Sequence, residues 1–133
     1  MAIFRVNELV IGELEIAVCN ELWDHGEADV RTMHERIGVV RGISSNTVQS
    51  ALDRLYRKRV LSRRKVGSAY VYAPALNREQ FAGRLVNSVA SVLGTAGRVP
   101  MLSAFVEFAG QADPAMLGRL EALIADARKG GKR

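Results

Sequence analysis

The residues of this chain that could do chemistry lie mostly between Ser44 and Tyr72. The first part of this stretch carries short hydrogen-bonding side chains, and the second part carries arginines and lysines. Short Asn, Gln, Ser and Thr side chains can hydrogen-bond to base edges in the major groove of DNA, whereas Arg and Lys bind phosphates. This order of side chains predicts a surface that binds a nucleic acid.

Positive charge is concentrated in the second part of the stretch. From Arg41 to Tyr70 there are eight basic residues and one acid, Asp53, a charge of +7, so the rest of the chain carries −2 to give the net +5. A charge run is most often only a solvated surface, but seven cations within twelve positions beside a helix indicate a polyanionic partner. The predicted contacts to double-stranded DNA are Arg41, Ser44, Ser45, Asn46, Thr47, Gln49, Ser50, Arg54, Arg57, Lys58, Arg63, Arg64, Lys65, Ser68 and Tyr70.

One amphipathic helix is predicted to carry most of these residues. It begins at Ser44 or Ser45, because either hydroxyl can cap the free amides of the first turn, and it ends near Lys58. At 100° per residue its apolar and polar side chains separate onto opposite faces. The buried face is predicted to hold Val48, Ala51, Leu52 and Leu55, and the outward face Asn46, Ser50, Asp53 and Arg57.

Two strands, Val60–Lys65 and Ala69–Tyr72, are predicted to follow this helix and to meet near Gly67 and Ser68, with Pro74 closing the domain. A helix followed by such a hairpin is typical of the recognition helix and wing of a winged helix-turn-helix. Because strand side chains alternate, at most two of Arg63, Arg64 and Lys65 can face DNA. Tyr70 and Tyr72 share a face, where packing in the hairpin is favoured over contact with DNA.

Two helices are predicted before this region. The first spans Gly12–Trp23, with Ile11 and Leu14 at helical spacing and Trp23 in the core. The second begins after Asp29, a candidate N-cap, and is followed by a loop from Gly38 to Ile43.

From Asn77 onward the chain reads as three helices: Arg78–Leu93, Met101–Ala109 after a joint at Gly94–Pro100, and a last one starting at Asp113-Pro114. About 55 residues are too few for an independent core, so their apolar faces predict a partner, most simply a second copy of the chain. The alternative is that these helices fold back onto the winged domain. The predicted dimer contacts are Phe81, Leu85, Val89, Leu102, Phe105, Val106, Met116, Leu120, Leu123 and Ile124.

The predicted fold is therefore mainly α with a small β-hairpin: a winged helix-turn-helix DNA-binding domain at residues 1–76 and a three-helix dimerisation region at residues 77–133.

Four fragments carry a family resemblance: IGELE at residues 11–15, LW at 22–23, TVxxxLxRLxxK at 47–58 and YxYxP at 70–74. In this order and spacing the chain resembles the penicillinase-repressor (BlaI/MecI/CopY) family. The resemblance implies a homodimeric winged-helix repressor that binds a palindromic operator, with the helix from Ser44 in the major groove and the C-terminal helices forming the dimer.

The resemblance also implies a means of induction. In β-lactam-responsive members a membrane sensor metalloprotease triggers cleavage of an Asn-Phe bond that is followed by Val-Glu. Here Phe105, Val106 and Glu107 match, but Ala104 replaces the asparagine. Cleavage between Ala104 and Phe105 is thus one hypothesis, and the alternative is that Phe105 and Val106 only pack in a dimer core. Arg59 stands where the family often has glycine, so the helix is expected to end differently and Arg59 to offer a further phosphate contact.

Other classes of function find little support in the residues. The Cys-rich end of copper-responsive relatives is missing, and His25 and His34 have no metal-ligand spacing, so no metal or other cofactor is expected. Catalytic motifs are absent. Cys19 is the single cysteine, and neither a signal peptide nor a long apolar run is present, which predicts a cytoplasmic protein. Two alternatives stay open: a regulator that binds a small molecule among Phe81, Phe105 and Phe108, and a protein-interaction adaptor that does not bind DNA.

Overall fold

The computed structural model describes residues 3–6 and 9–130, and it describes side chains from residue 12 onward. The chain divides into two compact units, residues 1–89 and 90–133.

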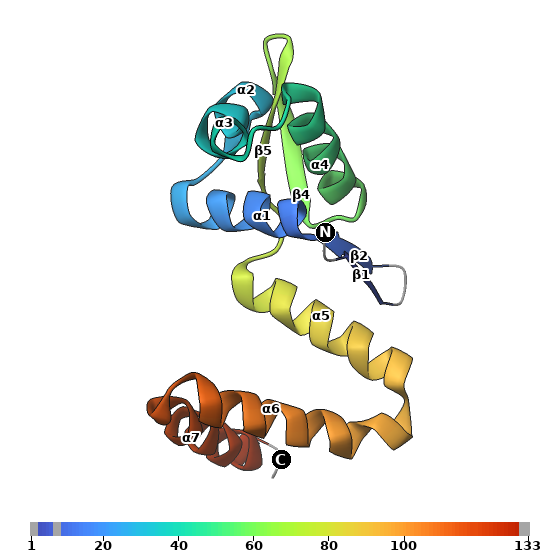
Figure 1. Ribbon diagram of the computed structural model, residues 1–133, viewed down its shortest axis with the longest axis vertical. Helices are drawn as coiled ribbons and strands as arrows, with labels where there is room; N and C mark the ends of the chain where they lie inside the picture. The colour runs from blue at the N-terminus through green and yellow to red at the C-terminus, as the bar shows by residue number, and fades with distance from the viewer. Residues whose placement is uncertain (1–2, 7–8, 131–133) are drawn as a thin grey trace. The chain divides into compact units, whose positions relative to one another are not determined.

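The first unit is a three-stranded antiparallel sheet with helices packed against it (Figure 1). The strands lie in the order β3-β5-β4, with Ala28 opposite Tyr72 and Lys65 opposite Tyr70. The elements in chain order are β1 (Ile3–Val6), β2 (Leu9–Gly12), α1 (Glu13–His25), β3 (Ala28–Asp29), α2 (Val30–Met33), the π-helical turn η1 (His34–Gly38), α3 (Val39–Arg41), α4 (Ser45–Arg57), β4 (Leu61–Val66), β5 (Ala69–Pro74) and the start of α5 (Arg78–Leu93).

One hydrophobic core joins these elements. From α1 it contains Val18, Cys19 and Leu22, which recur at helical spacing, and from the other elements Met33 and Val60 are fully buried with them. Helix α4 contributes the four predicted apolar residues, Val48, Ala51, Leu52 and Leu55. The arrangement of three helices and a hairpin confirms the predicted winged helix-turn-helix fold.

The first helix differs from its prediction at both ends. It ends at His25 rather than Trp23, where Gly26 takes a positive φ of 85° and donates its amide to the Leu22 carbonyl. The residue Ile11 lies in β2 and not in the helix, because an antiparallel hairpin of β1 and β2 that was not predicted occupies the chain up to Gly12.

The second helix begins as predicted, with the Asp29 carboxylate accepting from the Thr32 amide at 2.8 Å. The predicted loop from Gly38 was wrong, because the helical path continues through η1 and α3 to Arg41. Gly38 does not end the helix but allows close packing: a Cβ at this position would lie 2.5 Å from Cδ2 of His34. The helix ends instead at Gly42, with a left-handed φ of 67°.

The start of α5 belongs to the first unit. The Trp23 indole donates to the Leu76 carbonyl at 2.9 Å, and its ring centroid lies 5.4 Å from that of Phe81. Phe81 is buried and Leu85 packs against the same core, which is a different role from the dimer contact predicted for them. The bounds of α5, Arg78–Leu93, agree with the predicted helix.

The second unit contains the end of α5, a 3-10 turn η2 (Thr95–Gly97), α6 (Arg98–Ala112) and α7 (Pro114–Gly130). The predicted joint at Gly94–Pro100 was too long, because α6 starts at Arg98. Pro100 lies in its first turn, where a missing amide hydrogen breaks no helical hydrogen bond. The predicted start of the last helix is confirmed: the Asp113 carboxylate accepts from the Ala115 amide at 3.0 Å, ahead of α7.

Among the described residues no single helix is long and apolar enough to cross a membrane; only α5 together with residues Thr95–Ala112, a sharply bent pair, meets those criteria.

Candidate nucleic-acid interface

The amino end of α4 is fixed by its cap. Ser44 is the N-cap: its Oγ accepts from the Thr47 amide at 3.1 Å and lies 3.0 Å from the Thr47 hydroxyl. Of the two predicted caps, Ser44 is therefore the one used. The hydroxyls of Ser44 and Thr47, both predicted to contact DNA, already bond to each other.

The outward face of α4 has the predicted composition. Asn46, Gln49 and Ser50 are exposed, while the apolar residues between them are completely buried. The helix thus presents short donors and acceptors at its amino end without any contribution to the core. Such side chains can form paired hydrogen bonds to base edges.

The carboxyl end of α4 closes with a residue that is rarely found there. Arg59 has a φ of 64° and is the one described non-glycine residue with a positive φ. Its amide donates to the Tyr56 carbonyl and the Val60 amide donates to the Leu55 carbonyl, both at 3.0 Å, which is a Schellman cap. We expected the helix to end differently from one that has glycine at this position, and that expectation was wrong. Arg59 adopts the left-handed conformation that glycine adopts without strain.

A buried carboxylate of α1 holds the last turn of α4. Glu15 lies on the core side of α1, where its Oε1 accepts from Nε of Arg54 at 3.1 Å and its Oε2 accepts from Nζ of Lys58 at 2.7 Å. Both cations were predicted to contact DNA, and Lys58 is largely covered. Glu15 was missed in the sequence, although its spacing to Val18, Cys19 and Leu22 places it on the buried face.

A second carboxylate joins α4 to the hairpin of β4 and β5. Asp53 accepts from Nε of Arg57 at 2.8 Å and from Nη1 of Arg63 at 3.3 Å. The hydrogen bond from Arg57 holds the pKa of the Asp53 carboxyl below its usual range, with further help from the charge of both arginines. The pKa of Arg57 is raised by the same contact.

The guanidinium of Arg63 lies between two tyrosine rings. Its Cζ is 3.9 Å from the centroid of Tyr56 on α4 and 4.1 Å from that of Tyr70 on β5. It also donates to the Tyr72 hydroxyl at 3.4 Å. Tyr72 is buried in the hairpin, as favoured from the sequence, while Tyr70 is exposed.

The other cations of the wing alternate as predicted. Lys65 lies on the side of Arg63, with its Nζ 6.0 Å from the Tyr70 centroid. Arg64 points to the other side and binds both carboxylate oxygens of Glu27. The two strands turn at Gly67, which has a φ of 64°, and Ser68 is exposed at the tip.

Of the eight cations predicted to contact phosphates, six pair with acids of the same chain: Arg41, Arg54, Arg57, Lys58, Arg63 and Arg64. Besides the pairs with Glu15, Asp53 and Glu27, Arg41 pairs with Glu13 at 3.1 Å. These pairs fix where the cations lie, and the exposed ones are worth little to stability.

The comparisons with known proteins agree with this geometry. The penicillinase repressor family model matches residues 11–126. The transcriptional regulator BlaI of Mycobacterium tuberculosis, in strains CDC 1551 / Oshkosh and ATCC 25618 / H37Rv, is 33% identical over 102 residues, 75% of this chain and 74% of the relative. The chain belongs to the penicillinase repressor family. Among solved structures it is similar to the DNA-binding domain of the repressor BlaI, at 26% identity and a TM-score of 0.49, covering 53% of this chain and 85% of that one.

Membership of the penicillinase repressors makes this chain a transcriptional repressor with a DNA-binding domain. The predicted resemblance and the predicted winged-helix class are thereby confirmed.

The second unit of this repressor exposes most of its predicted dimer contacts. Leu102, Phe105, Val106, Met116, Leu123 and Ile124 are exposed, and Leu120 is half-buried. The Ala104–Phe105 bond, predicted as a cleavage site, lies inside α6.

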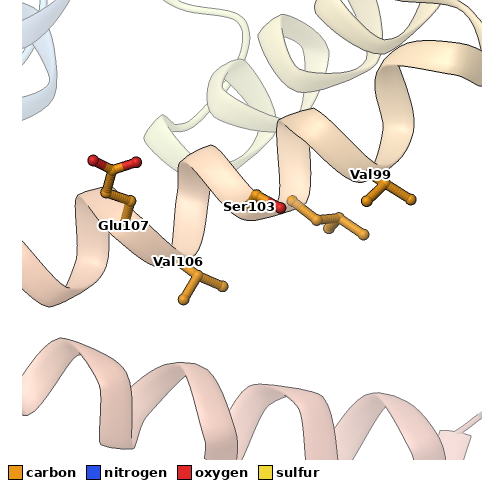
Figure 2. Close-up of a pocket in the computed structure, with 5 residues that line it drawn as sticks. Val99, Ser103, Val106 and Glu107 are labelled. Atoms are coloured by element: carbon orange, nitrogen blue, oxygen red, sulfur yellow. The ribbon is translucent and has the colours of Figure 1, made fainter.

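A cavity of about 420 Å³ follows one side of α6 (Figure 2). It is lined by Val99, Leu102, Ser103, Val106 and Glu107. The small-molecule alternative predicted a pocket among Phe81, Phe105 and Phe108. Phe81 instead lies in the core of the first unit, and neither Phe105 nor Phe108 lines this cavity.

Proposed function

We propose that two copies of this chain bind an inverted-repeat operator, each with α4 in the major groove. The observation that carries this proposal is the polar outward face of α4. Its Asn46, Gln49 and Ser50 side chains are exposed although all apolar neighbours are buried. These exposed side chains are of the types that hydrogen-bond to base edges, and the cations of α4 follow them toward its carboxyl end.

The roles of the side chains follow from their position on α4. Asn46, Gln49 and Ser50 hydrogen-bond to base edges and determine sequence preference. Arg57, at the carboxyl end, and Lys65, on the wing, bind phosphates and fix the position of the helix. Two such helices lie about 34 Å apart, one turn of DNA.

The second unit supplies the dimer contact in this proposal. Large apolar side chains on α6 and α7, among them Leu102, Phe105, Val106, Leu123 and Ile124, are exposed, and exposed apolar patches on soluble proteins mark interaction sites. A two-fold pair of identical copies covers such a surface on both partners at once. Joining two DNA-binding units also raises the affinity for a two-site operator well above that of one unit.

We further propose that the repressor acts in the cytoplasm on β-lactam resistance-type genes and is induced by proteolysis between Ala104 and Phe105, through a membrane sensor metalloprotease. The match of Phe105, Val106 and Glu107 to the family's cleavage sequence supports this. Since a protease requires extended backbone, the middle of α6 must unwind first. Immunoblots of cells treated with a β-lactam test this induction: a shortened repressor supports it, and derepression with only full-length protein contradicts it.

The operator proposal is tested with a duplex obtained by in vitro selection with the full-length chain. Footprinting is expected to show an inverted repeat with one turn between half-site centres. Asn46→Ala and Gln49→Ala should change preference among related duplexes, whereas Arg57→Ala should weaken binding to all of them and reduce the salt slope by about one. A protein that selects no sequence and protects no repeat is an adaptor and not a repressor of this kind.

A further inference from the structure

An acid on the DNA-facing side of a recognition helix needs an explanation. Asp53 is the only acid between Arg41 and Tyr70 in the sequence, and it lies on the outward face of α4, half-exposed. A carboxylate there repels the phosphates that the surrounding cations attract. It must therefore contribute something that offsets the repulsion.

The first contribution is to the geometry of the wing. The guanidinium of Arg63 lies over the rings of Tyr56 and Tyr70, and its Nη1 donates to Asp53 and Tyr72. Only 21% of the Arg63 side chain is exposed, so it links α4 to the hairpin and is not a free surface cation. Asp53 is the carboxylate on α4 to which Arg63 binds.

The second contribution is to the orientation of Arg57. Of the five N–H groups of a guanidinium, Asp53 accepts the one on Nε and leaves the four on the terminal nitrogens. The side chain of Arg57 is 74% exposed, so without Asp53 it would sample many rotamers. With Asp53 its terminal nitrogens are aimed at one place beside the helix.

We propose that Asp53 is a specificity-determining residue: it aims Arg57 at one phosphate of the operator and disfavours binding to unrelated DNA. This inference rests on the proposed function and adds a residue to it. On the operator, the base contacts place a phosphate where Arg57 points. The favourable contact between the oriented Arg57 and this phosphate then offsets the repulsion between Asp53 and the DNA. On unrelated DNA, binding is electrostatic and the register varies, so only the repulsion remains.

The substitution Asp53→Asn keeps the size of the side chain, removes its charge, and replaces the ion pair with Arg57 by a weaker hydrogen bond to a neutral amide oxygen. Binding to a base-scrambled duplex is expected to tighten about five- to tenfold near 0.1 M salt, as one opposing charge is removed from the interface. Binding to the selected operator should change by less than about twofold, since the weaker hold on Arg57 cancels the gain. The ratio of the two affinities should therefore fall at least about 2.5-fold.

Two further variants make the experiment decisive. Glu35→Gln removes an acid of the same type, paired with Arg31 four residues earlier at 3.4 Å and exposed on η1; it should leave the affinity ratio unchanged. In an Arg57→Ala background, Asp53→Asn should tighten operator and scrambled DNA equally, because nothing is left to orient.

The outcomes are distinguishable by variant. If wild-type protein does not discriminate between the operator and scrambled DNA, the proposed function fails and this inference fails with it. If wild type discriminates but Asp53→Asn tightens both duplexes by the same factor, the proposed function stands and Asp53 is only a surface charge. A fall in the ratio that persists without Arg57 also rejects the positioning role.

Discussion

Arg84 on α5 donates from Nη1 to the main-chain carbonyl of Lys58 at 2.7 Å. The acceptor belongs to the C-cap residue of α4, so the helix that follows the wing is tied directly to the end of the recognition helix. Lys58 also reaches Glu15 on α1 with its side chain. The carboxyl end of α4 is therefore held from two helices, through the Lys58 carbonyl from α5 and through the side chains of Arg54 and Lys58 from α1.

Replacing Arg84 by methionine tests the first of these ties. The substitution keeps the aliphatic part of the side chain and removes the donor, leaving a carbonyl at the helix end without this partner. We expect a loss of about 1–2 kcal/mol in the free energy of unfolding, measured by urea denaturation. Arg84→Lys, which keeps one donor, should recover part of the loss; equal stability of wild type and Arg84→Met would contradict the tie.

Removing the Glu15 carboxylate tests the second tie. Glu15→Ala removes the carboxylate that accepts from Lys58, whose side chain is largely covered, while Arg54 is half-exposed and can turn to water. We expect a loss of about 2–3 kcal/mol, below the usual cost of breaking a fully buried pair because Arg54 is solvated. Chemical denaturation measures the free energy of unfolding, with Glu35→Gln at an exposed position as the control. A change under about 0.5 kcal/mol would show that the ion pairs of Glu15 do not stabilise the fold.

Arg59→Gly should stabilise the protein. A side chain at a φ of 64° brings its Cβ close to the backbone, and glycine relieves this strain at a Schellman cap. The gain, about 1 kcal/mol, is reduced by the greater freedom of glycine in the unfolded chain. Thermal melts of Arg59→Gly and Arg59→Ala separate the effect of the backbone from that of the lost charge, since only glycine should raise Tm. Lower stability of the glycine variant would contradict the proposed backbone strain at Arg59.

Cys19 should be inert in the folded protein. Burial raises the pKa of its thiol from 9.0 to about 12, and the nearby Glu15 charge adds to the shift. A thiol reagent at pH 8 should react only after denaturation. The unfolded chain releases this proton near pH 9 and the folded chain keeps it to near pH 12, so stability falls as pH rises through that window. Cys19→Ala should lack this part of the decline; fast labelling of native protein would refute the burial.

The parts of the fold that followed from the sequence are those where one face of an element is apolar. Val48, Leu52 and Leu55 recur at helical spacing and are all buried, so α4 and its outward face could be inferred. The start of α7 followed from an N-cap with proline after it. In each case a local pattern and the tertiary packing required the same structure.

The parts that did not follow depend on contacts between distant residues. In a sequence, a glycine can mark the end of a helix or a point where a side chain packs closely against the backbone. Only the nearby His34 ring shows that Gly38 allows close packing. The same holds for cations: a free phosphate contact and a pair with Glu15, separated from Lys58 by more than forty residues, look alike in the sequence. No periodicity predicted the hairpin of β1 and β2.

The pairing of cations with Glu13, Glu15, Glu27 and Asp53 has a consequence for how the protein finds its target. Arg41 with Glu13 and Arg64 with Glu27 are nearly dipoles, whose fields decay faster with distance than that of a lone charge. Glu15 and Asp53 each pair with two cations, so each of these clusters keeps a charge of +1. A duplex about one Debye length away therefore meets the +7 of the segment less the three charges of Glu13, Glu15 and Glu27, which is +4. Attraction at that distance is correspondingly weaker, and more of the discrimination between sequences is left to the short range of direct contact.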